Sequence, residues 1–221
     1  SNIIHGSYLS GVKNLIFLGS SCIYPKRTKQ PIKESYFMTG PLEETNDAYS
    51  IAKIAGVKMC MEYSKQYKLD YKTLMPANMF GSNDNYDLKS SHFFPALIKK
   101  IHMAKIKKEK SVTLWGNGKP KRELLYVEDF ADACVFFMKK KTKESFINIG
   151  SGVEKSIEQF AKYIMKKLKV NLKIKYDLSK PNGMKRKKLD LKIANKYGWK
   201  AKTKLDKAFI EVYSDYLKSN S

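Results

Sequence analysis

NLIFLGSSC, residues 14–22, is a short apolar run that ends in a glycine, two serines and a cysteine. A run of this length without polar alternation is typical of a strand that is buried on both faces of a parallel sheet. In open α/β sheets, ligands bind beyond the carboxyl ends of the strands. Ser20, Ser21 and Cys22 are therefore expected at the edge of the sheet where a ligand would lie.

Strands and helices alternate on both sides of this run. Capping side chains at 45–47 predict the start of a helix that continues to about Tyr67, and YKTLMPANMFG (71–81) predicts the next strand. Further strands are predicted in 112–118, 145–152 and 172–176, and further helices around 130–138, 157–168 and 205–216. This alternation predicts an α/β fold around a mostly parallel sheet.

The formal net charge of the 221-residue chain is +22. A basic protein of this size could bind nucleic acid. Its basic residues, however, are almost all lysines spread along the chain, with arginine only at positions 27, 122 and 186, and base-edge recognition relies heavily on arginine. We expect solvated lysine faces that favour anionic small molecules. A non-catalytic, basic nucleic-acid-binding module is the alternative from a different class.

Composition also argues against a membrane protein and a metalloprotein. No apolar run approaches the roughly 18 residues of a membrane span. The three cysteines form no CxxC pair, which suits reduced thiols in the cytoplasm. Three scattered histidines and three scattered cysteines offer no metal-ligand spacing, so no metal is predicted.

Tyr49 and Lys53 form a Tyr-x-x-x-Lys motif on the predicted helix 45–67. Residues four apart share one helix face, and a nearby ammonium lowers the pKa of a phenol toward the range useful in acid–base chemistry. The same spacing also begins at Tyr163 and Tyr176, as chance alone would predict in so lysine-rich a chain. Only Tyr49 follows a strand that ends in hydroxyl side chains, so its place in the chain distinguishes this motif from the other two.

A strand-end serine followed by a helical Tyr-x-x-x-Lys resembles the short-chain dehydrogenase/reductase superfamily, in its extended, nucleotide-sugar branch. Longer strings narrow the resemblance to the GDP-L-fucose synthases, over nearly the whole chain: FLGSSCIYPK, KQPIKES, YSIAKIAGVKMC, MPANMFG, SHFFPALIKK, WGNGKPKREL, YVEDFADA, INIGSG and KPNGMKRKKLD. The resemblance implies a Rossmann-type doubly wound parallel sheet with a smaller α/β substrate-binding domain. It also implies NADP(H) as cofactor, GDP-4-keto-6-deoxy-D-mannose as substrate, and a homodimer.

The same resemblance implies roles for individual residues. Ser20, Tyr49 and Lys53 would form the catalytic triad of the reduction, and Cys22 and His92 the pair that epimerises C3 and C5. The cofactor would contact Lys53, Pro76, Asn78, Met79 and His92. The substrate would contact Ser20, Ser21, Asn78, Lys100, Trp115, Arg122 and Lys185, with Arg186 as an alternative to Lys185. Without the resemblance, Cys22 would be interpreted as a small buried apolar residue, and His92 as a packed or exposed histidine without a functional role.

Two domains are expected from the resemblance. Residues 1–81 and 124–150 would form the C-terminal part of an NADP-binding Rossmann domain, and residues 82–123 and 151–221 the nucleotide-sugar domain. The lysine-rich stretch 180–188 is predicted to be an exposed loop, and Asp129 to cap the helix that follows it.

One element of a dinucleotide-binding fold is missing from the sequence. No strand leads into a Gly-rich GxGxxG or GxxGxxG loop, which holds the pyrophosphate of a dinucleotide at a helix N-terminus. We therefore expect an N-terminal segment beyond this chain, carrying that loop and the residues that choose NADPH over NADH. The chain alone is expected to expose a sheet edge and to bind cofactor poorly. Another NAD(P)-dependent nucleotide-sugar epimerase or dehydratase remains the alternative within the same branch.

Overall fold

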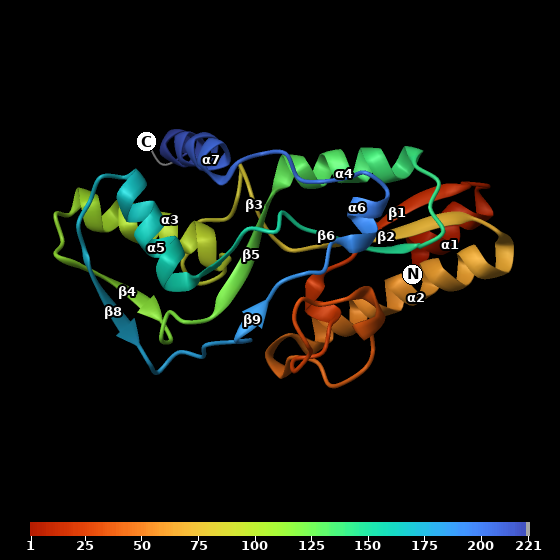
Figure 1. Cartoon of the computed structure of the whole chain (residues 1–221), viewed down its shortest axis with the longest axis horizontal. Helices are drawn as coiled ribbons and strands as arrows, with labels where there is room; N and C mark the ends of the chain where they lie inside the picture. The colour runs from red at the N-terminus through yellow and green to blue at the C-terminus, as the bar shows by residue number, and fades with distance from the viewer. Residues whose placement is uncertain (220–221) are drawn as a thin grey trace. The chain divides into compact units, whose positions relative to one another are not determined.

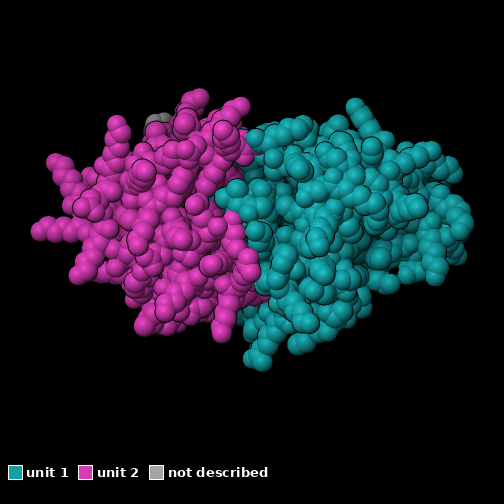
Figure 2. Space-filling model, in the orientation of Figure 1, with its two compact units in different colours: residues 1–79, 123–153, 187–202 teal, residues 80–122, 154–186, 203–221 magenta. Residues whose placement is uncertain are grey.

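The computed structural model describes residues 1–219 (Figure 1). The chain divides into two compact units, coloured separately in Figure 2. Unit 1 contains residues 1–79, 123–153 and 187–202, and unit 2 contains residues 80–122, 154–186 and 203–219. Within the described residues, no helix combines the length and the apolar character needed to cross a membrane.

Unit 1 is built on a parallel sheet with the strand order β1-β2-β6. Its strands are β1 (Asn14–Leu18), β2 (Asp70–Pro76) and β6 (Phe146–Ile149), with Leu18 opposite Leu74 and Pro76 opposite Ile149. Figure 1 shows α2 (Asp47–Tyr67) and α4 (Val127–Lys139) on opposite sides of this sheet, with α1 (Asn2–Leu9) beside α2. The predicted α/β fold with a parallel sheet is confirmed.

The core of unit 1 explains why these segments fold as they do. β2 and β6 are buried along almost their whole length, as expected for strands covered by helices on both faces. Val57 of α2, Phe137 of α4 and Leu74 of β2 are fully buried in one apolar cluster. β1 is an edge strand of this sheet, and an apolar groove runs along it between α1 and α2, lined by Ile4, Phe17 and Met59 among others.

Gly56 sets the distance between α2 and β1. A Cβ atom at this position would lie 2.3 Å from Cζ of Phe17, so the helix can approach the strand only because residue 56 has no side chain. Gly6 of α1 has an open environment, with nothing within 4 Å of the same atom. The two glycines therefore make a matched pair for testing how tightly α2 must pack.

Gly56→Ala is expected to destabilise the protein by about 1–3 kcal/mol, because the Phe17 ring has to move out of a packed position. Gly6→Ala should instead stabilise it by roughly 0.5–1 kcal/mol, since alanine reduces the entropy lost when a helix forms. The measurement is urea unfolding of both variants beside the parent chain. Equal stabilisation by both substitutions would contradict the close packing of α2 on β1.

Unit 2 contains α3 (Phe93–Ile106), α5 (Ile157–Lys167), α7 (Leu205–Ser219), and a parallel pair of strands, β4 (Ser111–Trp115) and β8 (Lys173–Asp177). α3 and α5 pack against each other through Phe94 and Phe160, whose ring centroids are 5.6 Å apart. A further sheet has the order β3-β5-β7, with β9 beside β5. These strands are β3 (Asn78–Phe80), β5 (Lys121–Tyr126), β7 (Glu154–Ser156) and β9 (Arg186–Lys187).

Residues 187–202, which include α6 (Lys192–Lys196), belong to unit 1, whereas the sequence placed them in the nucleotide-sugar domain. Leu189, Ala194 and Trp199 are buried in the same core as β2 and β6. The backbone N–H of Ile32 donates to the carbonyl of Lys188 at 2.7 Å, and the N–H of Asp190 donates to the carbonyl of Ile32 at 2.8 Å. These buried side chains and the two backbone bonds tie the segment to unit 1, which no local pattern reveals.

Two smaller predictions about polar residues were wrong. The stretch 180–188 is not exposed throughout, because Arg186 and Lys187 form β9 and Lys187 is only 9% exposed. Asp129 does not cap α4, since Tyr126 occupies the N-cap position. Asp129 instead lies buried in the first turn and accepts a hydrogen bond from the backbone N–H of Lys202 at 3.3 Å.

Candidate active site

The turn after β1 presents the predicted serine and cysteine of the site. Ser20 has an extended backbone and its Oγ accepts a hydrogen bond from the N–H of Cys22 at 3.2 Å, which caps a short 3-10 helix over Ser21–Ile23. Ser21 is buried at 4% exposure, while Ser20 and Cys22 are half-buried. Gly19 makes the turn possible, because a Cβ atom there would lie 2.2 Å from Sδ of Met75.

The helix α2 is locked onto this turn by two side chains. The ammonium of Lys53 donates to the carbonyl of Leu18 at 2.8 Å, and the hydroxyl of Ser50 donates to the carbonyl of Cys22 at 3.1 Å. The Lys53 Nζ lies 5.7 Å from the centre of the Tyr49 ring, and Tyr49 is 46% exposed. The structure therefore holds the helix of Tyr49 and Lys53 against the strand end that carries Ser20 and Cys22.

The Cys22 thiol lies in a partly buried, positively charged environment. The Lys187 ammonium is 3.2 Å from the Cys22 Sγ. Burial raises the pKa of the Cys22 thiol, but the charge of Lys187 and hydrogen bonds with Ser20, Lys187 and Asn46 lower it by more, so the net shift is downward. The other two cysteines behave in the opposite way: burial raises the pKa of Cys134 and raises that of Cys60 to about 11. A thiolate is thus most accessible at Cys22.

The segment from Pro76 to Met79 lies at the carboxyl end of β2, the same edge at which β1 ends, because the two strands are parallel. Pro76 is buried, Asn78 donates from Nδ2 to the carbonyl of Glu123 at 3.0 Å, and Met79 is 38% exposed. The exposed Tyr49 and Met79 and the Lys53 ammonium suit the reactive end of a nicotinamide dinucleotide. No Gly-rich pyrophosphate loop occurs in residues 1–219.

Glu123 supports this edge and was missed by the sequence analysis. Its side chain is fully buried, and its two carboxylate oxygens accept hydrogen bonds from the backbone N–H groups of Gly152 at 2.7 Å and Leu189 at 2.9 Å. A buried carboxylate is stable where backbone donors satisfy it. Glu123 therefore ties the segment after β6 to the segment after β9, next to the carbonyl that holds Asn78.

Unit 2 contains a cavity of about 310 Å³ that brings together four predicted site residues: His92, Lys100, Trp115 and Arg122. Trp115 is 52% exposed, and the ammonium groups of Lys100 and Lys180 lie 5.1 and 5.6 Å from its ring centre. Burial lowers the pKa of Lys100, which the charge of Asp177 partly opposes. The cavity combines an aromatic wall with cationic groups, which suits a nucleotide with phosphates.

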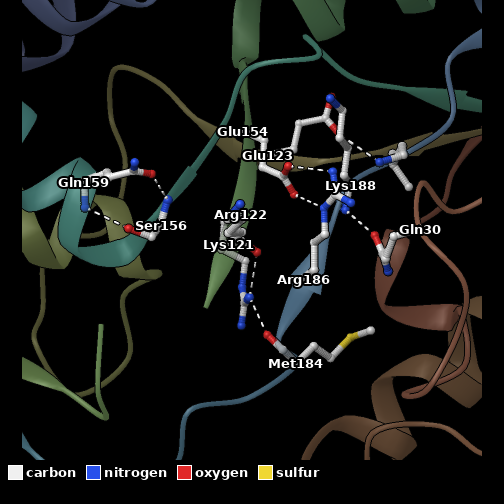
Figure 3. A network of polar contacts seen from close by, with 11 residues as sticks. Gln30, Lys121, Arg122, Glu123, Glu154, Ser156, Gln159, Met184, Arg186 and Lys188 are labelled. Atoms are coloured by element: carbon white, nitrogen blue, oxygen red, sulfur yellow. Dashed lines mark hydrogen bonds and ion pairs between the residues drawn. The ribbon is translucent and has the colours of Figure 1, made fainter. Parts of the chain in front are cut away.

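Arg122 and Arg186 differ in how their guanidinium groups are engaged (Figure 3). Arg122 donates from Nη1 to the carbonyls of Lys121 at 2.9 Å and Met184 at 2.6 Å. Arg186 forms a two-pronged ion pair with Glu154, at 2.7 and 2.8 Å. This pair occupies the planar fork of Arg186. Lys185 is exposed and is absent from the cavity lining in the described structure.

The cavity also contains Pro181 and Asn182, which the sequence analysis did not assign to the site. Asn182 Oδ1 accepts a hydrogen bond from the N–H of Asn117 at 2.8 Å. Gly116, with φ +65°, permits this contact, because a Cβ atom there would lie 2.4 Å from the same oxygen. The signal was available in the string KPNGMKRKKLD, whose proline and glycine mark a turn, but its target lies 65 residues away in the chain.

Comparison with known proteins identifies the family and the fold. The family model described as "NAD dependent epimerase/dehydratase family" matches residues 1–150. The chain belongs to this family. Membership in the epimerase/dehydratase family agrees with the position of Ser20, Tyr49 and Lys53 at the carboxyl edge of the sheet.

GDP-L-fucose synthases are among the relatives within the epimerase/dehydratase family. The GDP-L-fucose synthase of Sinorhizobium fredii is 46% identical over 98% of this chain and 69% of its own length. That of Escherichia coli is 40% identical over 99% of this chain and 71% of its own length. A solved GDP-L-fucose synthetase from Naegleria fowleri bound to NADP superposes with a TM-score of 0.90 at 26% identity, covering 99% of this chain and 70% of that one. The sequence resemblance to GDP-L-fucose synthases is thereby confirmed.

Proposed function

We propose that this protein converts GDP-4-keto-6-deoxy-D-mannose to GDP-L-fucose, by epimerisation at C3 and C5 and then reduction at C4 with NADPH. The observation that carries the proposal is the turn after β1. It places a hydroxyl and an acidified thiol two residues apart, Ser20 and Cys22, with the helix of Tyr49 and Lys53 bonded to the same turn. A reductase needs the hydroxyl, the phenol and the ammonium, whereas the thiol is needed only where carbon centres are inverted.

Epimerisation uses protons that the C4 ketone acidifies on the neighbouring carbons. The Cys22 thiolate can exchange a proton with such a carbon, and the imidazole of His92, which lines the unit 2 cavity, is the group proposed to exchange one from the opposite face. Ser20 and Tyr49 are proposed to donate hydrogen bonds to the C4 oxygen and to stabilise the enolate.

Reduction at C4 requires a proton for the oxygen and an oriented ketone. We propose that Tyr49 gives this proton and that Lys53 orients the ribose of the cofactor while keeping the phenol reactive. Pro76, Asn78 and Met79 are proposed to line the nicotinamide end. Hydride transfer itself is the chemistry that a bound NADPH supplies. Lys100, Trp115 and Arg122 are proposed to hold the GDP moiety in the unit 2 cavity.

Arg122→Gln is expected to weaken GDP binding about tenfold to a hundredfold, since charge-assisted hydrogen bonds to phosphate are worth about 1.5–3 kcal/mol. Binding is measured by titrating GDP and following the fluorescence of Trp115, the more exposed of the two tryptophans. Arg27→Gln, the same change at an exposed arginine of unit 1, should leave the affinity unchanged. Equal losses in both variants would mean that general positive charge, rather than the cavity, binds GDP.

We also propose that the protein acts as a homodimer through α1 and α2. Ile3 and Leu9 of α1 are 82% and 69% exposed, Ile51 of α2 is 57% exposed, and the two helices pack side by side. Paired helices with exposed apolar side chains suit a symmetric interface. Sedimentation of the parent chain and of Ile51→Glu would show a dimer converted to a monomer. A monomeric parent would refute the interface.

The function is tested by mixing the protein with NADPH and GDP-4-keto-6-deoxy-D-mannose. Loss of the reduced-nicotinamide absorbance and formation of GDP-L-fucose are the expected results. The assay is run on this chain and on the chain extended by any coding sequence found upstream of Ser1, because the Gly-rich loop is absent from residues 1–219. If an extended protein binds NADPH but leaves this substrate unchanged, the proposed substrate is wrong.

A further inference from the structure

Lys187 is a buried cation whose ammonium makes no ion pair with a carboxylate of residues 1–219. It lies in β9 and is only 9% exposed. Among the described residues, its ammonium donates a hydrogen bond to the Cys22 Sγ at 3.2 Å and forms no ion pair with Asp or Glu. A buried ammonium is costly unless a negative charge accompanies it. The group in contact that can carry such a charge is the Cys22 sulfur.

The backbone around Lys187 is held in place from several directions. The N–H of Lys188 donates to the side chain of Gln30 at 3.0 Å, as Figure 3 shows. The carbonyl of Lys188 accepts from Ile32, and the N–H of Leu189 donates to the buried carboxylate of Glu123. The backbone that follows Lys187 is thus held by two other parts of unit 1, residues 30–32 and Glu123, which fixes the point from which the Lys187 side chain reaches Cys22.

Cys22 is contacted by groups from each element around it. Ser20 precedes it in the same turn, Asn46 lies at the start of α2, Ser50 bonds its carbonyl from within α2, and Lys187 approaches from β9. Of these groups only Lys187 carries a full charge. The hydroxyl and amide neighbours can hydrogen-bond either a thiol or a thiolate, whereas an ammonium favours the thiolate alone.

We propose that Lys187 is a positioning residue. Its ammonium forms an ion pair with the Cys22 sulfur across the turn after β1, and this ion pair keeps Cys22 as a thiolate and holds it in place. Its use in catalysis rests on the proposed function. There, the thiolate takes a proton from the carbon beside the C4 ketone: an S–H bond forms, the C–H bond breaks, and its electron pair moves into the enolate. The enolate carbon takes a proton from His92 on the opposite face, and the half-buried Cys22 thiol gives its proton to solvent water, so that the cycle can restart.

The first test measures the thiol directly and needs no substrate. The chain is alkylated with iodoacetamide across a pH series, and peptide mass spectrometry follows Cys22, Cys60 and Cys134 separately. In the parent chain Cys22 is expected to react with a midpoint below the value of about 8.5 for a free thiol. Cys60, whose pKa burial raises to about 11, serves as an internal reference and should react slowly. A parent midpoint at or above that of a free thiol would overturn the proposal without any variant.

Lys187→Met is expected to raise the midpoint of Cys22 by a unit or more and to slow its alkylation at neutral pH about tenfold or more, since the reactive species is the thiolate. Lys187→Arg should restore most of the shift because the charge remains. Lys192→Met, at an exposed lysine of α6, is the matched control and should behave like the parent chain. An unchanged Cys22 profile in a folded Lys187→Met would refute the proposal.

A second readout separates this proposal from the proposed function. In active enzyme, Lys187→Met should shift the pH profile of solvent-deuterium incorporation at C3 and C5 upward, while reduction of an already epimerised substrate continues. If the parent enzyme shows no such incorporation but the alkylation shift is found, the ion pair stands and the proposed function fails. If incorporation occurs with an unshifted profile, Lys187 has no part in activating Cys22.

Discussion

Tyr49→Phe is expected to lower the rate of C4 reduction about 10²–10⁴-fold, the range that a positioned proton donor supplies. The variant keeps the ring and its contact with Lys53, whose Nζ lies 5.7 Å from the ring centre. It removes only the hydroxyl that is proposed to give a proton to the C4 oxygen. The measurement is single-turnover oxidation of NADPH at saturating substrate, which excludes changes in binding or product release.

Tyr163→Phe is the control for this change, because Tyr163 has the same local arrangement with a lysine as Tyr49 but is not one of the predicted site residues. Tyr163 and Lys167 have the same spacing on a helix, and the Lys167 Nζ lies 5.6 Å from the Tyr163 ring centre. The Tyr163 hydroxyl donates to Asp206 at 2.9 Å, so a small loss of stability is expected and no loss of catalysis. Similar catalytic losses in the two variants would show that Tyr49 acts through folding.

Cys22→Ser should abolish epimerisation, with solvent-deuterium incorporation at C3 and C5 falling by about 10²–10⁴-fold. A serine hydroxyl is a far weaker acid than a thiol, so the charge of Lys187, 3.2 Å away, no longer produces a usable base. The substitution changes little volume, and the backbone N–H of residue 22 still donates to Ser20 Oγ. Mass spectrometry and NMR of the recovered nucleotide sugar measure the incorporation at each carbon.

Cys134→Ser is the matched control, since this half-buried cysteine of α4 lies far from the turn in sequence and burial raises its pKa. It should retain full deuterium incorporation.

The Cys22 variant also separates enzymes of the same branch. A reductase or 4-epimerase that leaves C3 and C5 unchanged would keep its activity in Cys22→Ser, and that outcome would replace the proposed reaction with one of those.

The pH dependence of epimerisation follows from the lowered pKa of Cys22. A lowered pKa means that the thiolate persists to lower pH than in a free cysteine, so incorporation should fall only once the pH drops below the shifted value. The sign is opposite for Cys60 and Cys134, whose burial favours the neutral thiol. The direction of this profile therefore identifies which cysteine is used.

The sequence by itself determined the fold class and the part of the site that is local. Apolar runs and helical spacing are short-range properties, so β1, α2, β2 and the later alternation could be predicted, and the carboxyl edge of the sheet followed from strand direction. Tyr49 and Lys53 share a helix face because they are four residues apart. Placing Ser20 and Cys22 at this edge required only the prediction of where one strand ends.

Tertiary structure decided which distant groups complete the site. Lys187 is one of several lysines in a run without helical or strand periodicity, and nothing local marks it as the one that contacts Cys22, 165 residues earlier. The same holds for Asn182, which joins the cavity of unit 2, and for residues 187–202, which pack into unit 1. A side chain's burial and charge partner depend on long-range packing, and a sequence pattern records only the neighbours along the chain.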